Sequence, residues 1–586
     1  MTILKCLGAW FGLTLMMFVL GQVFADFAFI NFAHMDSKLV DSTTYIQFFK
    51  FIFIDGYSST FTMKLIYIVS FIIFLSPTFI IIVFLIPKSE KLHGEARFAT
   101  DLELKKSKLF DPQDSPYIVI GKREKGILKD KYCCVGGTNH VGVTAPTSGG
   151  KGVGIVLPNL VTFTDSLVVL DVKLENYRKT ASYRKKALNN EIYIFAPDQA
   201  QSHCWNVFDY VDRKLEKRVG DILVIANSLY PKMGDSSDQW QGFAQNLFLA
   251  LCLYCLDKEK STGEVVSLVE INELGCHPDL TKFMKGEVAK QKLLEQGKAS
   301  EDVFRLSRDT ILQFNAFISI PPETQGSILT NFREPLTIFL DEDCKNATQS
   351  SSFDLREVRK KKITIYIGIS PSNITKYKVL LNLFFEVLLS QNTKELPEDN
   401  PKLKYQCLLL LDEFAILGRV NQIKSAISYA RGYNIRFLLV YQSEAQLEDK
   451  SLYDKEGART IIDNLNVRVV YPTKLADSQA KLISETLGSK TVRVRNKSIN
   501  SGKHASRSTA FQEQKRMLMM PHELIELGFE KYPDTTIGKN ILILRDNQRP
   551  FKLVKLLSFA DVSFSKAIEQ SKEDFNKLKE SGKLLI

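Results

Sequence analysis

Residues Val141–Leu157 read VGVTAPTSGGKGVGIVL, and this stretch decides the fold. Val141 and Val143 have the alternation of a strand, a turn of small residues follows, and Lys151 stands where an apolar helical pattern begins. Glycines let successive backbone N–H groups turn toward an anion, a helix N-terminus adds partial positive charge, and a lysine reaches the outer phosphates. This order of elements predicts a phosphate-binding loop rather than an ordinary glycine-rich turn.

The loop departs from the pattern G-x-x-x-x-G-K-[ST] at two positions. Ala145 replaces the first glycine, which costs little if that position does not need a positive φ. Gly152 stands where a hydroxyl would hold magnesium, so the metal must be held by water, by Thr147 or by a carboxylate elsewhere. We expect ATP to contact Thr147, Ser148, Gly149, Gly150, Lys151, Gly152 and Val153.

A second motif, Gln406–Arg419, reads QCLLLLDEFAILGR. Its apolar run Cys407–Leu411 is typical of a strand buried on both faces of a parallel sheet. The strand ends in two acids, at the edge where open α/β sheets bind ligands. We expect Asp412 to orient a magnesium shell and Glu413 to polarise the water that attacks the γ-phosphate. For this chemistry, Lys151 and the two acids must meet at the same edge of one sheet. The alternative is a strand that ends in an acidic helix cap.

Strand and helix patterns alternate before and after a long helical region, which predicts a parallel α/β sheet with an insertion. From 206 to 334 helical periodicity dominates, so we expect an all-α insertion there. Within it, Lys282–Glu301 is either a solvated helix face or a substrate-docking surface. Asp171, at the end of the apolar strand 166–171, fits a metal or water position and a helix cap equally well. Further strands are expected at 117–121, 132–135, 192–195, 363–369, 435–441, 467–471, 541–544 and 551–557, and a helix is expected at 423–433.

Length and composition indicate several domains and a folded chain. The chain has 586 residues, 45% of them hydrophobic and 24% charged, and a net charge of +11, which permits an anionic partner without requiring one. Its nine cysteines are scattered. Cys252 and Cys255 lie in an apolar helical run, so a redox or metal role is not expected, and the odd count suits a reducing compartment.

Two apolar runs near the N-terminus, Leu7–Val23 and Leu65–Ile86, are long enough to cross a bilayer. The first also resembles a secretory signal, although an uncleaved anchor is the favoured interpretation. We expect spans at about 4–24 and 65–86 with a short outer loop between them. Six lysines and arginines between 88 and 108 follow the second run, so the positive-inside rule predicts a cytoplasmic C-terminal bulk.

Two polar features complete the set of candidates. Gln442 follows the strand 435–441 and could contact the γ-phosphate or the attacking water, or simply end the strand. The stretch Gly488–Arg516 is basic and poor in large apolar residues, so it could track a phosphate backbone or form a solvated hairpin. Its candidate contacts to nucleic acid are Arg493, Arg495, Lys497, Lys503 and Arg507.

With these residues assembled, the chain resembles the coupling-protein ATPases of type IV secretion and bacterial conjugation (TraG/TraD-like). GEARFAT at 94–100, APTSGGKGVGIVLPNL at 145–160, LLDEFAILGR at 410–419 and ARGYNIRFLLVYQSEAQL at 430–447 carry the likeness, together with ETQGSILTNF at 323–332 and the segment 353–369. The GKG ending also occurs in that family, which accounts for Gly152. VVLDVKLEN at 168–176 departs from it, because the family usually has glycine where this chain has Leu174.

The resemblance implies a RecA-like P-loop ATPase domain with an inserted all-α domain and two N-terminal transmembrane helices. We divide the chain into an anchor (1–90), a first nucleotide-binding part (91–205), the all-α domain (206–334), a second nucleotide-binding part (335–560) and a helical tail (561–586). The family implies ATP and Mg²⁺ as cofactors, a homo-hexamer and a two-pass bacterial inner-membrane location. Arg431 matches a candidate arginine finger offered to the neighbouring subunit's ATP.

The implied activity is ATP-driven delivery of a relaxase–DNA complex, of protein effectors, or of both to a type IV secretion channel. Single- or double-stranded DNA is an expected partner. One alternative is a cargo receptor or platform whose nucleotide controls assembly. Another is a hexameric DNA pump of a different system, which the motifs in 323–369 and the lack of a long linker disfavour.

Overall fold

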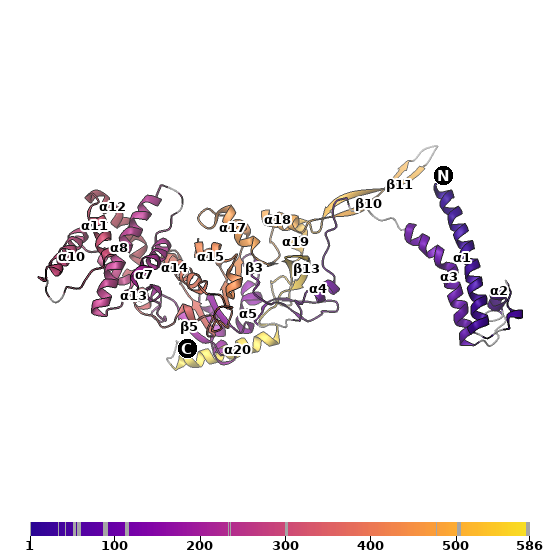
Figure 1. Ribbon diagram of the computed structural model, residues 1–586, viewed down its shortest axis with the longest axis horizontal. Coiled ribbons are helices and arrows are strands. Elements are labelled where there is room, and N and C mark those ends of the chain that lie inside the picture. Colours follow the sequence, from indigo (N-terminus) through magenta and orange to yellow (C-terminus); the bar gives the residue numbers. More distant parts are fainter. Residues whose placement is uncertain are drawn as a thin grey trace. The chain divides into compact units, whose positions relative to one another are not determined.

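The computed structural model describes residues 2–32, 34, 36–41, 43–50, 54, 60–85, 92–111, 116–232, 234, 236–298, 300, 303–475, 477–500 and 506–581 (Figure 1). The chain divides into two compact units, Met1–Leu92 and His93–Ile586. The N-terminal unit contains the apolar helices, and the larger unit contains the sheet with the phosphate-binding loop.

Two long helices, α1 (Thr2–Phe32) and α3 (Phe61–Leu85), pack together in the N-terminal unit. Their interface uses small residues, because Ala25 and Ala28 are buried and a Cβ at Gly21 would lie 3.1 Å from the carbonyl oxygen of Ser70. Small side chains let two helix backbones approach closely. The short elements η1 (Ser37–Leu39) and α2 (Thr44–Phe49) lie between the two helices in sequence.

One described helical stretch, Gly12–Asn31, is long and apolar enough to cross a membrane. The first predicted span ended near residue 24, but α1 continues to Phe32 because apolar residues go on to the helix end. In α3 the apolar part found within the described residues is the shorter Phe61–Ser76. The predicted second span also includes Ile86, which lies outside the described residues, so a second crossing stays a prediction.

The larger unit contains a mixed sheet of eleven strands in the order β2-β1-β13-β12-β9-β3-β8-β7-β4-β6-β5. Neighbouring strands from β9 to β5 are parallel, and those from β2 to β9 are antiparallel. The strands are β1 (Ile118–Lys122), β2 (Tyr132–Val135), β3 (Val141–Thr144), β4 (Ser166–Leu170), β5 (Glu191–Phe195), β6 (Ile363–Ile367), β7 (Cys407–Leu411), β8 (Ile435–Tyr441), β9 (Val467–Val470), β12 (Asn540–Arg545) and β13 (Gln548–Val554).

Helices cover both faces of this sheet, which explains its unbroken apolar strands. In β7, Leu409 and Leu411 pack in the cluster that includes residues of α14 (Ile374–Asn392), α7 (Leu215–Leu229) and α8 (Asp238–Thr262). Leu408 and Leu410 pack in the cluster on the other face, which includes residues of α5 (Leu157–Thr162), α6 (Glu175–Lys186) and α20 (Val562–Glu580). The α/β prediction is confirmed, with the difference that the last strands join in an antiparallel arrangement.

Helices fill the sequence between β5 and β6, and Figure 1 shows them gathered at one end of the larger unit. The described residues of 206–334 contain no strand, as predicted, and the helical run continues to Thr348. These helices belong to the same compact unit as the sheet, so a separate all-α domain stays a prediction. They are α7 (Leu215–Leu229), α8 (Asp238–Thr262), α9 (Leu268–Gly275), α10 (Leu280–Glu295), α11 (Arg308–Ile318), α12 (Pro322–Arg333), η5 (Glu334–Leu340) and α13 (Glu342–Thr348).

The helix predicted at 423–433 is interrupted. It consists of α15 (Asn421–Ala426) and the 3₁₀ turn η8 (Ala430–Tyr433), which ends at Asn434 in the left-handed conformation. Asparagine tolerates this conformation and stops the turn just before β8 begins.

Leu174 adopts the left-handed conformation, with φ of 52°. This backbone explains why glycine would suit the position, since a left-handed conformation costs an ordinary residue about 1–2 kcal/mol. Leu174 is nevertheless buried, and its side chain occupies the space beside Gly368, where an added Cβ would lie 2.6 Å from Leu174 Cγ. Leucine at position 174 therefore requires glycine at position 368.

We predict that Gly368→Ala lowers the melting temperature of the protein, because the new methyl group overlaps Leu174 and overpacking costs about 1–3 kcal/mol. In a Leu174→Gly background the same substitution should cost little, since the obstructing side chain is gone. Gly286→Ala, on exposed helix α10 with no atom within 4 Å of the new Cβ, is the matched control and should not destabilise. Equal losses in both backgrounds would contradict the steric account.

Candidate nucleotide site

The loop after β3 has the backbone geometry of an anion-binding turn. Ser148 and Gly150 have φ values of 63° and 82°, and Gly149 N–H donates to the carbonyl oxygen of Pro146 at 3.0 Å. Ala145 is not among the described residues with positive φ, so its replacement of glycine causes no strain. Its N–H donates to the carbonyl oxygen of Tyr441 at 3.0 Å, which fixes the start of the loop on β8.

The helix that follows begins with a wide turn. Gly152–Val156 form the π-helical element η3, and α5 follows directly. Lys151 is the residue before η3, so its side chain leaves the chain at a helix N-terminus. A Cβ at Gly152 would meet no atom within 4 Å, so space alone does not explain the absence of a hydroxyl residue there.

Lys151 contacts both acids of the second motif. Its Nζ donates to the carbonyl oxygen of Asp412 at 3.0 Å, forms an ion pair with Glu413, and lies 3.8 Å from Asp412 Oδ1. The sheet explains the contact, because β8 pairs in parallel with both β3 and β7 and all three strands end at one edge. Two motifs separated by about 260 residues therefore meet at one place, as the sequence predicted.

Two acids at this edge, the half-buried Asp412 and the buried Asp171, are held in a setting that disfavours their charge. Burial raises the pKa of Asp412, an effect that Lys151 opposes, and Asp412 Oδ1 is buried without a hydrogen-bond donor among the described residues. Burial raises the pKa of Asp171 to about 6, although its Oδ2 accepts from the N–H of Tyr177 at 2.8 Å. This bond favours the helix-cap interpretation of Asp171, since Tyr177 lies in the first turn of α6.

The unpartnered oxygen of Asp412 is chemically suited to a hard cation, and so is the acidic neighbourhood. Within the part of the chain that the structure describes, no group of three or more His, Cys, Asp or Glu side chains has the arrangement of a metal centre. A magnesium ion here would therefore take most of its ligands from phosphate and water, which is how Mg²⁺ is usually bound.

A cavity of about 410 Å³ lies beside these acids, in the size range of small-molecule sites. Gly152 and Val153 of the loop line one side, and Asp412 and Glu413 line another. Lys173 and Lys179 line the wall formed by α6 and the turn before it, where Lys179 is paired with Glu175 at 3.2 Å. The cavity thus joins the loop, the acids and two further cations.

The remaining two predicted catalytic residues lie at opposite ends of β8. Gln442 follows the strand at the edge of the phosphate-binding loop and is exposed. Arg431, on η8, precedes the strand. Because β8 has seven residues, about 23 Å of strand separates the two ends. Arg431 is therefore not brought to the phosphate-binding loop of its own chain.

Sequence reasoning missed Lys555, which follows β13 and lies under the loop. It is only 3% exposed, its Nζ donates to the carbonyl oxygen of Gly149 at 3.0 Å, and it stands 4.4 Å from the ring centre of Tyr471. Burial lowers the pKa of Lys555 from 10.5 to about 8. Buried lysines without a carboxylate partner are uncommon, and the one available signal was a lysine inside the apolar run VKLLSF.

Residues that follow β9 or precede β12 also pack on the loop. Tyr471 N–H donates to the carbonyl oxygen of Thr144, and a Cβ at Gly150 would lie 2.9 Å from Ile537 Cγ2. Lys474 Nζ lies 3.4 Å from Thr147 Oγ1. The segments next to β9 and β12, at the antiparallel end of the sheet, therefore pack against the phosphate-binding loop.

The basic stretch forms a two-stranded hairpin, β10 (Ser489–Asn500) and β11 (Ser506–Met517), which projects from the body of the larger unit in Figure 1. Arg493 pairs with Glu513 at 2.9 Å, and Arg495 stands opposite Phe511, which is 69% exposed. These positions alternate along the strands and so share one face.

The other predicted nucleic-acid contacts are only partly described. The register puts Lys497 opposite Thr509 and Arg507 opposite Ile499, on the same alternation as Arg493. The side chains of Lys497 and Arg507 lie outside the description, as does Lys503 altogether. Contact with nucleic acid stays a prediction.

Comparison with known proteins gives consistent matches over the larger unit. Residues 97–582 match the family described as Type IV secretory system Conjugative DNA transfer. Protein VirD4 of Rhizobium radiobacter is 27% identical over 495 residues, which cover 82% of this chain and 66% of VirD4. The chain thus spans slightly less than two thirds of the length of that relative.

Solved structures of the coupling protein TrwB share the fold. A TrwBdeltaN70 structure in complex with sulphate superimposes with a TM-score of 0.56, at 16% identity, over 80% of this chain and 95% of the other. A TrwB structure in complex with ADP and Mg²⁺ has a TM-score of 0.50 at 16% identity, over 71% and 85%. At this identity the likeness concerns the fold alone.

We predict that Lys555 gives the protein a stability that rises with pH above about 8. Its pKa is lower in the folded chain, so between about 8 and 10.5 the unfolded chain binds more protons, and stability gains at most about 1.4 kcal/mol per pH unit. The melting temperature of wild type relative to that of Lys555→Met should therefore be higher at pH 9.5 than at pH 7.5. Parallel pH profiles for the two proteins would mean that the lysine is not buried as described.

Proposed function

The chain belongs to the Type IV secretory system Conjugative DNA transfer family, and from this premise we propose that it is a membrane-anchored coupling ATPase. It recruits DNA–protein complexes, protein effectors or both, and delivers them to a type IV secretion channel by hydrolysing ATP. The observation that carries the enzymatic part is the contact of Lys151 with Asp412 and Glu413 at one edge of the sheet.

In this proposal the triphosphate lies on the loop 147–153 and Lys151 exchanges its carboxylate partner for the β- and γ-phosphates. Glu413, released from the ion pair, then accepts a proton from the attacking water. Asp412, through its unpartnered oxygen, would hold Mg²⁺ directly or through water, and the ion would neutralise charge on the phosphates. Binding of ADP and Mg²⁺ by TrwB supports these cofactors.

The ion pair between Lys151 and Glu413 opposes hydrolysis until a nucleotide binds. As long as Lys151 and Glu413 neutralise each other, neither is available for its part in hydrolysis. Bound phosphate, which carries more charge than one carboxylate, competes for the lysine. We propose that, because of this competition, Glu413 leaves its ion pair with Lys151 only when a nucleotide is bound.

Gln442 and Arg431 have different parts in the proposal. Gln442, at the loop edge of β8, contacts the γ-phosphate or the water and senses hydrolysis. Arg431 acts on the ATP of the neighbouring subunit in a homo-hexamer, where it stabilises charge in the transition state. The distance along β8 supports action between subunits, because the same chain's site is out of reach.

The anchor and the basic hairpin connect this motor to its partners. We propose that α1 and α3 are two membrane spans in a bacterial inner membrane, with the larger unit in the cytoplasm. The hairpin face that carries Arg493, Arg495 and Phe511 suits single-stranded DNA, since arginines bind phosphates and an exposed ring can stack on a base. The relaxase–DNA complex, effectors and channel components are the proposed partners.

We predict that Lys151→Ala abolishes ATP binding, and that Glu413→Gln retains binding but lowers hydrolysis at least about a hundredfold, as loss of a general base does. Phosphate release and nucleotide affinity should be measured on the purified protein with and without single-stranded DNA. Unchanged hydrolysis in both variants would refute the motor mechanism. Loss of hydrolysis with undiminished cargo transfer in cells would favour the alternative, a receptor whose nucleotide controls assembly.

We also predict that Arg431→Ala loses hydrolysis and keeps nucleotide affinity, and that it is rescued by mixing. In mixed oligomers of Arg431→Ala and Glu413→Gln, about a quarter of the shared sites would combine an intact base with an intact neighbouring arginine. Hydrolysis in the mixture should therefore exceed that of either variant alone. Absence of rescue, or loss of affinity in Arg431→Ala, would point to a structural role for this arginine.

A further inference from the structure

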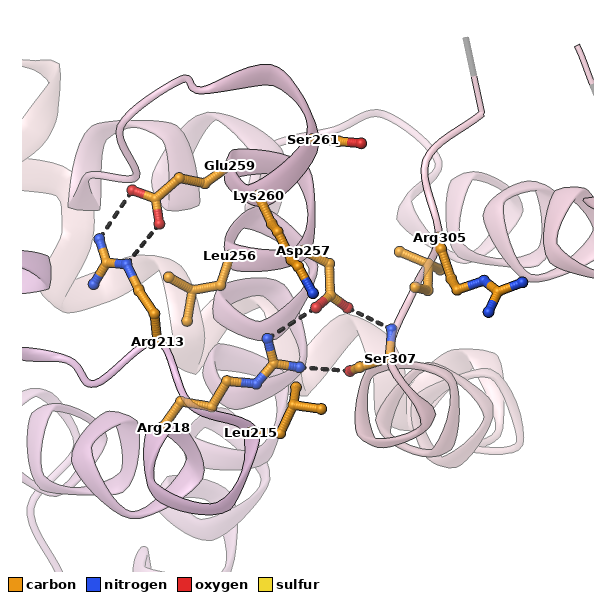
Figure 2. Close-up of a pocket in the computed structure, with 11 residues that line it drawn as sticks. Arg213, Leu215, Arg218, Leu256, Asp257, Glu259, Lys260, Ser261, Arg305 and Ser307 are labelled. Carbon is orange, nitrogen blue, oxygen red and sulfur yellow. Dashed lines mark hydrogen bonds and ion pairs between the residues drawn. The ribbon is translucent and has the colours of Figure 1, made fainter. Parts of the chain in front are cut away.

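A cavity of about 500 Å³ lies among the helices between β5 and β6, and none of its lining residues belongs to the nucleotide site (Figure 2). Its walls come from the first residues of α7, the end of α8 and the segment that leads into α11. The volume is in the range of pockets that hold small molecules or a few side chains.

The cavity has an apolar base and an apolar rim. Leu256 and Leu306 line it and are each 4% exposed, so they form the base. Leu215 at the rim is 52% exposed, which is high for a leucine. A ligand that covered these three side chains would gain about 25 cal/mol for each Å² of apolar surface removed from water.

A buried polar network lies beside the leucines. Arg218, 3% exposed, donates from Nη1 to Asp257 Oδ1 at 2.8 Å and from Nη2 to Ser307 Oγ at 2.6 Å. Ser307 N–H donates to Asp257 Oδ2 at 2.7 Å, which ties α8 to the start of α11. The Nε of Arg218 is buried and has no acceptor among the described residues.

More positively than negatively charged side chains line the cavity. Asp257 is matched by Arg218, and Glu259 is matched by Arg213 through bonds of 2.7 and 2.9 Å, as Figure 2 shows. Lys260 and Arg305 also line the cavity, both are exposed, and neither forms an ion pair with any described residue. Two positive charges are therefore left over, and Figure 2 shows the Arg305 guanidinium directed away from Lys260.

We propose that this cavity binds an acidic, leucine-containing segment of a protein partner. One carboxylate of the segment pairs with Lys260 and another with Arg305, and an apolar side chain between them covers Leu256 and Leu306. A nucleic-acid backbone fits less well. Its phosphates bind to cationic surfaces, but it has no aliphatic side chain that could cover the leucines at the base of the cavity. The inference concerns recognition and requires no nucleotide hydrolysis.

The test uses the full chain in detergent micelles and fluorescein-labelled synthetic peptides. One peptide alternates leucine and glutamate, the second alternates leucine and lysine, and the third alternates serine and glutamate. Fluorescence anisotropy without nucleotide gives the affinities, so the result does not depend on whether the chain hydrolyses ATP. We expect binding of the leucine–glutamate peptide to be about tenfold tighter than binding of the other two.

The decisive variant carries Lys260→Glu and Arg305→Glu, and should lose at least about tenfold in affinity for the leucine–glutamate peptide. The matched control carries Lys572→Glu and Lys577→Glu, the same charge change on exposed positions of α20, and should bind as wild type. Should the first variant fold poorly in a circular-dichroism melt, the neutral pair Lys260→Gln and Arg305→Gln should show an intermediate loss.

Three results would overturn the proposal. Equal losses in the decisive and control variants would mean that the attraction is a general effect of net charge. Equal affinity for the serine–glutamate peptide would remove the leucines from recognition. Displacement of the peptide by a single-stranded oligonucleotide, with the same dependence on Lys260 and Arg305, would make the cavity a nucleic-acid site.

Discussion

The larger unit depends on the meeting of Lys151 with Asp412 and Glu413 at the carboxyl edge of the sheet. The contact exists because β8 lies between β3 and β7 and pairs with both in parallel. A shift of any of these strands by one residue would turn its side chains to the other face and move its end away from the lysine. Burial on both faces prevents such a shift, since each strand is packed against helices on either side.

Different charged side chains lie at the two edges of the sheet. At the amino edge, Arg184 and Arg436 are completely buried and donate to backbone carbonyl oxygens, among them those of Leu160 and Val135. Burial lowers the pKa of Arg184 to about 10 and that of Arg436 to about 9. At the carboxyl edge, the half-buried Asp412 lies next to the phosphate-binding loop. Cations thus fix the loops at one edge, while acids and the loop lysine form the candidate nucleotide site at the other.

The strands and the convergence of the two motifs could be predicted because they depend on local patterns and on the parallel arrangement. An apolar run such as Cys407–Leu411 indicates a buried strand, and parallel strands bring their carboxyl ends together. The break in the helix predicted at 423–433 and the burial of Lys555 were not predictable in this way. Both depend on which distant residues cover the segment, and the apolar run around Lys555, the one local signal, does not identify those residues. Leu174 was noticed as a departure, but only the position of Gly368 explains how it is accommodated.

Arg431 and the phosphate-binding loop lie at opposite edges of one sheet, and this constrains how copies of the chain could associate. In a twofold dimer the same patch meets itself, so an arginine and a loop on different sides of the molecule could not both lie in the contact. Sharing of a site between copies would instead need a head-to-tail contact, repeated from one copy to the next. Such a contact closes into a ring when its rotation divides a full turn evenly, and otherwise grows into an open filament.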